Sequence, residues 1–464
     1  MMRNKYITFI SFLSKRYSQE FGSIWWYSLL HEKNSAGKSR TYHNLIKDLQ
    51  PLLFSVYRAF YLALRKYIGF IVRHFIFIKQ GYKMYVGYDT LYVTYSDDFL
   101  SPLSDGQPKI YLPQKYNYKE FKNEWVIDHY VSKMDLLKLF FRYFPCLWKN
   151  SYLLPILKKE FKPPFDYKYF KEEIWRSFAG DVLVEGLFYE TAFTNMAKQF
   201  KNLKKVVYPY EGQAWEKALC RGFNQSDNRP EIVAILCACP PLNMLNYWYD
   251  KEEVELMPTP DRVGVLGNTT YNLFKEMYGN KTFIAGPMRF RIIEKYMGIK
   301  LLKSMSNKIL VVLSGVKVYA DELLNFISCI DVEDYELIVK PHPDYIDIKE
   351  GRYTIWEGED VMPALLDSRA IISIDSSISL MAVALNIPVI IPDLPTVAIM
   401  NPLFGISGFG LSWYFAAISN EASKVIKRLD DGHSMKSENR EIVKKSIEEY
   451  FDFSKNEREE LNNV

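Results

Sequence analysis

The sequence predicts an α/β protein of two successive Rossmann-like, doubly wound domains behind a mainly helical N-terminal extension. Three observations predict this class. From about residue 200 onward, short runs of β-branched and other apolar residues alternate with stretches long enough to form helices. Most of these runs end in glycine, proline or a small polar residue, as parallel strands do where they enter a loop. The alternation pauses near residue 300 and then resumes, which separates the two domains.

The N-terminal extension, residues 1–80, is predicted to be helical. Residues 52–78 are long enough to span a bilayer, but basic side chains interrupt them: Arg58, Arg65, Lys66 and Arg73. These recur about every seven residues, so we expect them on one stripe of an amphipathic helix. Two interpretations stay open: a helix packed on its own domain, and a basic helix lying peripherally on the inner face of the plasma membrane. A membrane span is the weakest interpretation.

The first domain is expected to extend from residue 1 to residue 290. Residues 84–96 are rich in strand formers, and residues 97–125 are typical of a loop. Residues 126–200 show a helical pattern that breaks at Pro163-Pro164. Strand-like runs then follow at residues 206–208, 232–237, 263–266 and 282–285, with a helix expected over residues 213–222.

The second domain is expected over residues 291–420. A linker helix is predicted over residues 290–306. Four strand-like runs follow it, at residues 308–313, 337–339, 371–374 and 389–391. Residues 421–464 are polar, with apolar side chains at helical spacing, and are predicted to form C-terminal helices.

Composition excludes several classes of protein. The 59 basic and 55 acidic residues nearly balance, which does not favour a nucleic-acid-binding protein. The 5 cysteines are scattered and no secretory signal is evident, so we expect a cytoplasmic location. No Walker loop, zinc-binding helix or Asp-x-Asp pair at a strand exit is present, and we therefore expect neither a cofactor nor a required metal.

A stiff histidine loop follows one strand of the second domain. His342 lies between Pro341 and Pro343, which restrict the backbone and remove two amide donors. Lys340 precedes this loop at the end of the strand. Ligands of parallel sheets bind beyond the carboxyl ends of strands, so lysine and imidazole together suit a phosphate. A structural loop whose histidine bonds a neighbouring carbonyl is the alternative.

Two more strand exits of this domain carry small polar residues. Asp375, Ser376 and Ser377 follow a strand and open a helix, which suits either an anion or simple N-capping. Ser314-Gly315 follows another strand, and a glycine there allows the backbone to approach a phosphate or base closely. We expect all of these residues to contribute to a nucleotide site.

Two acidic residues follow the strand-like run at residues 206–208 of the first domain. A carboxylate at Glu211 can deprotonate a sugar hydroxyl, and Gly212 leaves room for it. Glu216 is the next candidate, and Trp215 between them can stack on a sugar ring. The alternatives are a capping or solvated glutamate and a core tryptophan.

Three motifs, in order along the chain, resemble those of bacterial sialyltransferases and Kdo transferases of the GT-B type: Glu211-Gly212, His342-Pro343 and Ser376-Ser377. The resemblance implies a GT-B-like fold with an N-terminal acceptor-side domain and a C-terminal nucleotide-sugar-binding domain. It implies that Glu211 is the base acting on the acceptor. It also implies that His342 contacts the departing CMP phosphate and that the serines bind that phosphate.

The resemblance leaves the exact donor open. Residues 208–219 and 25–28 are also similar to proteins of capsule, O-antigen and lipopolysaccharide biosynthesis, which implies a glycan or glycolipid acceptor. The single acid before Gly212, where those families have two, leaves open whether Glu211 is a base or a nucleophile. The same motifs and fold also suit a CDP-polyol phosphotransferase of teichoic-acid type, a nucleotide-sugar 2-epimerase or a non-catalytic assembly protein.

Overall fold

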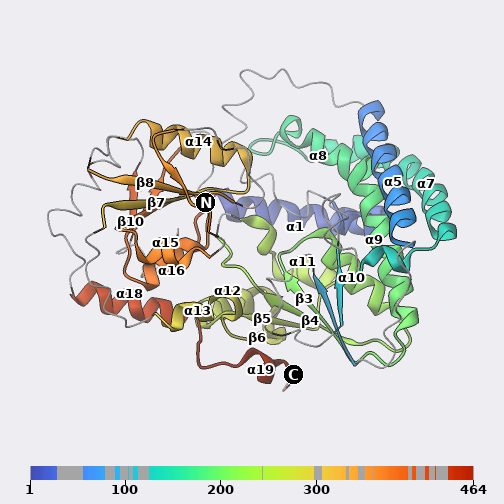
Figure 1. The fold of residues 1–464 in the computed structure, drawn as a ribbon. Coiled ribbons are helices and arrows are strands. Elements are labelled where there is room, and N and C mark those ends of the chain that lie inside the picture. The colour runs from blue at the N-terminus through green and yellow to red at the C-terminus, as the bar shows by residue number, and fades with distance from the viewer. Residues whose placement is uncertain are drawn as a thin grey trace.

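The computed structural model describes residues 2–28, 56–78, 89–94, 103, 108–112, 125–242, 244–296, 306–330, 334–342, 348, 351–358, 360–394, 400–403, 413–416, 424 and 437–462. These residues form two parallel α/β domains, with additional N-terminal helices, of which the first crosses the middle of the molecule and most of the others gather at one end (Figure 1). The predicted fold class is therefore confirmed. Pro343 and much of the expected linker helix lie outside the described residues.

The first sheet contains six strands in the order β2-β1-β3-β4-β5-β6. They are β1 (Thr90–Thr94), β2 (Lys109–Tyr111), β3 (Lys205–Tyr210), β4 (Glu231–Leu236), β5 (Arg262–Val265) and β6 (Thr282–Ile284). All neighbouring strands are parallel. The prediction of loop throughout residues 97–125 is wrong at β2, because three residues on a sheet edge are too few to carry a pattern.

The second sheet also contains six strands, in the order β12-β11-β10-β7-β8-β9. They are β7 (Lys308–Val312), β8 (Glu336–Lys340), β9 (Thr354–Ile355), β10 (Ala370–Ser373), β11 (Val389–Pro392) and β12 (Trp413–Ala416). The four predicted strands are its central members, and their apolar runs are buried on both faces. Because β10, β7 and β8 are adjacent and parallel, their carboxyl ends meet at one edge.

The N-terminal helices are α1 (Met2–Phe21), α2 (Ser23–Trp26), α5 (Val56–Ile78), α7 (Lys133–Lys158), α8 (Tyr167–Ala179) and α9 (Asp181–Gln199). A short 3₁₀ turn, η1 (Ile127–Tyr130), precedes α7. Large aromatic side chains hold this layer together; the rings of Phe21 and Phe178, for example, lie 4.3 Å apart.

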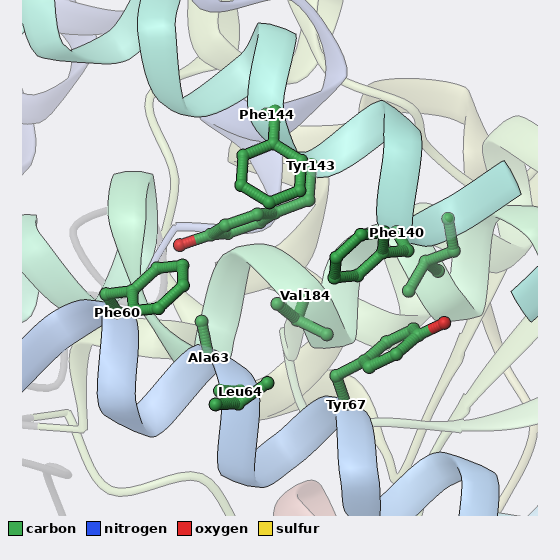
Figure 2. Close-up of a pocket in the computed structure, with 9 residues that line it drawn as sticks. Phe60, Ala63, Leu64, Tyr67, Phe140, Tyr143, Phe144 and Val184 are labelled. Carbon is green, nitrogen blue, oxygen red and sulfur yellow. The ribbon is translucent and has the colours of Figure 1, made fainter. Parts of the chain in front are cut away.

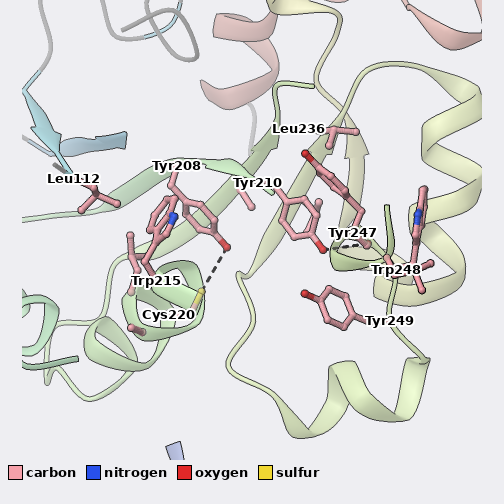
Figure 3. Close-up of a cluster of buried hydrophobic side chains, with 14 of the residues drawn as sticks. Leu112, Tyr208, Tyr210, Trp215, Cys220, Leu236, Tyr247, Trp248 and Tyr249 are labelled. Atoms are coloured by element: carbon pink, nitrogen blue, oxygen red, sulfur yellow. Dashed lines mark hydrogen bonds between the residues drawn. The ribbon is translucent and has the colours of Figure 1, made fainter. Parts of the chain in front are cut away.

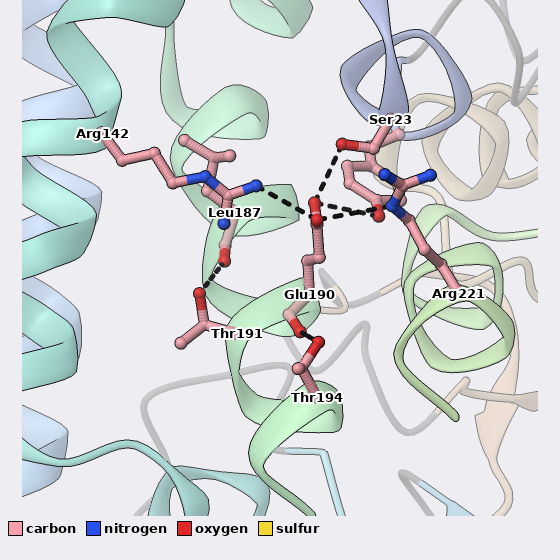
Figure 4. A network of polar contacts seen from close by, with 8 residues as sticks. Ser23, Arg142, Leu187, Glu190, Thr191, Thr194 and Arg221 are labelled. Atoms are coloured by element: carbon pink, nitrogen blue, oxygen red, sulfur yellow. Dashed lines mark hydrogen bonds and ion pairs between the residues drawn. The ribbon is translucent and has the colours of Figure 1, made fainter. Parts of the chain in front are cut away.

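A buried carboxylate ties these helices to the first domain (Figure 4). Glu190 on α9 accepts hydrogen bonds from Ser23 Oγ at 2.9 Å and Tyr27 Oη at 3.2 Å. It also pairs with Arg142 of α7 at 3.1 Å and with Arg221 at 3.4 Å. Because so many donors converge on it, the cost of burying this charge is offset.

The remaining helices cover the two sheets. Those of the first domain are α10 (Ala214–Asn224), α11 (Lys251–Leu256) and α12 (Asn268–Tyr278), with 3₁₀ turns η2 (Leu245–Tyr247), η3 (Gly279–Lys281) and η4 (Met288–Phe290). Those that follow are α13 (Arg291–Glu294), α14 (Lys317–Ser328), α15 (Met362–Leu366), α16 (Ile378–Ala384), α18 (Ser437–Tyr450) and α19 (Glu457–Asn462).

The C-terminal segment links the two domains. α18 packs against α16 of the second domain and α12 of the first. Beyond it, the Asp452 amide donates to the Leu266 carbonyl at 2.9 Å, and the Lys205 ammonium donates to the Leu461 carbonyl. The chain therefore returns to the first domain after completing the second.

Helix α5 has one face packed inside the molecule and one face outside. The ring of Phe70 stacks on Phe188 of α9 at 3.9 Å. Arg58 and Arg65 are exposed, but Arg73 is buried and pairs with Asp128 at 3.0 Å. The expected single basic stripe is therefore wrong at Arg73, because eight residues beyond Arg65 the helix has turned about 80° further. No helix in the described part of the chain has both the length and the apolar character needed to cross a membrane.

Candidate active site

Polar side chains from three adjacent strands meet at the carboxyl edge of the second sheet. Ser314 follows β7, and Asp375 follows β10. The Ser314 hydroxyl donates to Asp375 Oδ2 at 2.5 Å and accepts a hydrogen bond from the Val316 amide at 3.0 Å. The serine side chain is buried, so its hydroxyl shapes the loop and orients the carboxylate.

The imidazole of His342 reaches this cluster from the end of β8. Its ring packs against Gly315, where an added Cβ would lie 2.8 Å from both Cε1 and Nδ1. A side chain at position 315 would therefore displace the ring. Burial raises the pKa of Asp375, while the hydrogen bond from Ser314 and the positive charge of His342 oppose that rise. The carboxylate can thus stabilise a protonated imidazole.

Lys340 and the two serines border the same edge. Lys340 is half-buried at the end of β8, and its carbonyl accepts from the Leu313 amide at 3.1 Å. Ser376 Oγ accepts from the Ile378 amide at 3.2 Å, so this hydroxyl shapes the start of α16. Ser377 occupies the N-cap position but its side chain makes no capping bond. Of the two hydroxyls, that of Ser376 is engaged by the backbone, whereas that of Ser377 does not cap the helix.

The expected acid of the first domain lies at the end of β3. Glu211 is half-buried, and its carboxylate accepts from Gln213 Nε2 at 2.5 Å. Its carbonyl accepts from Asn246 Nδ2 at 2.6 Å. The backbone at Gly212 has φ 72°, and a Cβ there would lie 1.9 Å from the Asn246 carbonyl oxygen. Only glycine therefore allows this turn, which fixes the position of the neighbouring carboxylate.

Glu216 holds the same turn from inside. Its carboxylate accepts from the backbone amides of Glu211 at 2.9 Å, Gly212 at 3.1 Å and Gln213 at 2.9 Å. Its side chain is 2% exposed. Burial raises the pKa of Glu216 to about 8, although the charge of Lys217 and the amide donors lower it. Glu216 therefore orders the loop rather than meeting a substrate.

Trp215 is also buried and does not offer a surface to a sugar. Its ring meets Tyr208 edge-on at 5.6 Å (Figure 3). Its indole N–H donates to Gln213 Oε1 at 3.0 Å. The first turn of α10 thus points both Trp215 and Glu216 into the core, which differs from the expected substrate contacts.

Sequence reasoning missed several residues that support this loop. Lys217 Nζ donates to the Gly212 carbonyl at 2.7 Å and to Tyr249 Oη at 3.1 Å. Gln213 and Glu216 stand at the N-cap and third positions of α10, the spacing of a capping box, and that signal was available in the sequence. Tyr249 and Asn246 lie more than 30 residues further along the chain, so no local sequence pattern predicts their contacts with this loop.

The structure thus gathers two sets of residues, each at the carboxyl edge of its own sheet. The first consists of Glu211 and its supporting loop. The second consists of Ser314, Gly315, Lys340, His342, Asp375, Ser376 and Ser377. Within the residues that the structure describes, no three His, Cys, Asp or Glu side chains are grouped so that they could hold a metal ion.

No protein-family model matches the chain, and no curated protein matches it. Among solved structures, a glycosyltransferase from Rickettsia africae ESF-5 is 12% identical, with a TM-score of 0.42 over 82% of this chain and 98% of that one. The calicheamicin glycosyltransferase CalG4 is 11% identical, with a TM-score of 0.45 over 81% of this chain and 97% of that one. The wall teichoic acid polymerase TagF is 10% identical, with a TM-score of 0.38 over 88% and 96%. The two parallel α/β domains are established by the sheet topology itself, independently of these distant likenesses.

Proposed function

We propose that this chain is a glycosyltransferase that uses a CMP-activated 2-keto sugar acid, such as Kdo or a sialic-acid-like sugar, as its donor. One observation carries the proposal. The ring of His342 lies on Gly315 beside the Ser314–Asp375 pair, at a sheet edge that also carries Lys340. A histidine backed by a carboxylate and flanked by a lysine can take up the charge of a departing phosphate.

The proposed roles follow from these positions. The bond between the sugar carbon and the CMP phosphate oxygen breaks, and His342 donates a proton or hydrogen bond to that phosphate. Asp375 stabilises the imidazolium beforehand, while Lys340 and Ser377 bind the phosphate oxygens. These groups supply the charge that a metal would otherwise provide, so we propose that no metal is required.

The acceptor side of the reaction belongs to the first domain. We propose that Glu211 removes the proton from an acceptor hydroxyl as its oxygen bonds to the sugar carbon. Gly212, Gln213 and Glu216 fix that carboxylate in place. We propose that the acceptor is a surface glycan or a lipid-linked glycan, modified on the cytoplasmic side of the membrane.

A panel of activated donors tests the proposal. The purified protein is incubated with CMP-Kdo, CMP-sialic acid, UDP-sugars and CDP-glycerol, and release of the free nucleotide is measured. We expect CMP release from one CMP-sugar, and its loss in Glu211→Gln and His342→Ala. Glu276→Gln, an exposed site on α12, is the matched control and should keep full activity. Turnover of a UDP-sugar alone would contradict the donor class, and turnover of CDP-glycerol would favour a polyol phosphotransferase.

A further inference from the structure

Helices α5 and α7 form an antiparallel pair at one end of the molecule (Figure 1). The Tyr67 hydroxyl of α5 donates to the Leu136 carbonyl of α7 at 2.9 Å, and its ring lies 5.4 Å from Phe140. Further along α5, the ring of Phe75 lies 5.2 Å from the ammonium of Lys133, near the start of α7. Side chains of α5 therefore contact the first half of α7.

The outer side of α7 carries an unusual stripe of large apolar side chains. Six of them are exposed: Met134, Leu137, Phe141, Phe144, Trp148 and Tyr152. They recur every three or four residues, which places them on one helical face. Trp148 is 82% exposed and Tyr152 is 73% exposed, so neither side chain contributes to the core. A contiguous exposed stripe of this kind marks an interaction surface.

Helix α5 carries a matching stripe. Its exposed apolar side chains are Phe60, Tyr61, Leu64, Ile68, Val72 and Phe75. The two stripes meet at a shallow groove between the helices, where Phe60 and Leu64 face Phe144 (Figure 2). The groove has a volume of about 20 Å³, which is room for about one water molecule and excludes a small-molecule ligand. We call the two stripes together the α5–α7 face.

Basic residues border the α5–α7 face, and acidic residues are almost absent from it. The exposed cations on the two helices include Arg58, Arg65, Lys138 and Lys149. Asp135 is the one acidic residue within these two helices, and it is held by Ser132 at 2.6 Å and Asn195 at 3.0 Å. An uncovered apolar face with a basic border is complementary to anionic lipid headgroups above acyl chains.

We propose that the α5–α7 face rests on the surface of a bilayer that contains anionic phospholipids. Trp148, Tyr152 and Phe141 enter the headgroup region, where aromatic side chains are stable. Long basic side chains such as Lys138 and Lys149 extend to the phosphates beside them. This inference does not depend on which donor sugar the protein uses.

Sedimentation with lipid vesicles tests the inference. The full chain is mixed with vesicles of phosphatidylglycerol and phosphatidylethanolamine, or of phosphatidylcholine alone. We expect the protein to bind the anionic vesicles, and this binding should weaken at high salt. Binding to the neutral phosphatidylcholine vesicles should be weaker. Trp148→Ser with Tyr152→Ser should weaken binding more than about tenfold, and Lys138→Gln with Lys149→Gln by about tenfold. Ile442→Ser with Lys445→Gln, exposed positions on α18, is the matched control and should bind as the wild type does.

Three outcomes would overturn the inference. The first is that the wild type binds no vesicle, and the second is that the Trp148/Tyr152 variant binds as tightly as the wild type. The third is that the wild type forms dimers that this variant abolishes, without vesicle binding, which would make the face a contact between two copies.

Discussion

Alanine at Gly315 is the substitution that acts most selectively on the proposed chemistry. The added Cβ would lie 2.8 Å from two atoms of the His342 ring. Carbon atoms in contact are normally about 3.5–4.0 Å apart, so the ring must move by roughly 0.7 Å or more. A misplacement of about 1 Å in an active site can lower a rate about a hundredfold, so we expect kcat to fall about ten- to a hundredfold. The glycine backbone is not left-handed, so the free energy of unfolding should change by less than about 1 kcal/mol.

The assay is the rate of CMP release with saturating donor, measured together with urea unfolding. Val316→Ala changes the adjacent exposed residue and should leave both values near those of the wild type. Full activity in Gly315→Ala, when His342→Ala is inactive, would show that the position of the ring is not what the chemistry requires. A large loss of stability would show instead that the substitution disrupts the domain.

Three further predictions concern the supporting residues. Gly212→Ala should lower the free energy of unfolding by about 2–3 kcal/mol in urea titrations, because it strains a left-handed turn and breaks the Asn246 contact; an unchanged midpoint would contradict this. The folded-state pKa of Glu216, about 8, exceeds the ordinary value of 4.5, so its stabilising contribution is complete below pH 4.5 and is lost as the pH rises towards 8. Between those pH values, the wild type should lose about 4 kcal/mol of unfolding free energy relative to Glu216→Gln, and parallel pH profiles would refute the assignment. Asp375→Asn should lower kcat about tenfold with little change in KM, because the imidazolium of His342 loses its counter-charge; steady-state kinetics that show only a raised KM would argue for a binding role.

The central strands of both sheets were predictable because they are buried on both faces. Strands such as β7 and β10 appear in the sequence as continuous apolar runs that end in polar residues. β2 and β9 have three and two residues, and strands so short form only because a longer neighbour is already in place. Their existence is decided by tertiary pairing, which no local window contains.

The candidate site was predictable in part for the same reason. Ser314, His342 and Asp375 could be chosen from the sequence because each follows a predicted strand. Only the strand order β10-β7-β8 brings the ends of these strands together. The burial of Trp215 depends on how α10 packs on β3. A helix that begins at a sheet edge has an inner and an outer face, and the sequence alone does not define which face its first turn presents to solvent.

A cytidine nucleotide bound at the His342 edge of the second sheet is the central element of the proposed chemistry. Titration calorimetry of CMP and UMP into the wild type and His342→Ala tests this most directly. We predict that CMP binds the wild type more tightly than UMP does. Loss of a charge-assisted hydrogen bond, worth about 1.5–3 kcal/mol, should weaken CMP binding to His342→Ala about ten- to a hundredfold. Equal CMP affinity in both proteins, or a preference of the wild type for UMP, would contradict the proposed nucleotide site.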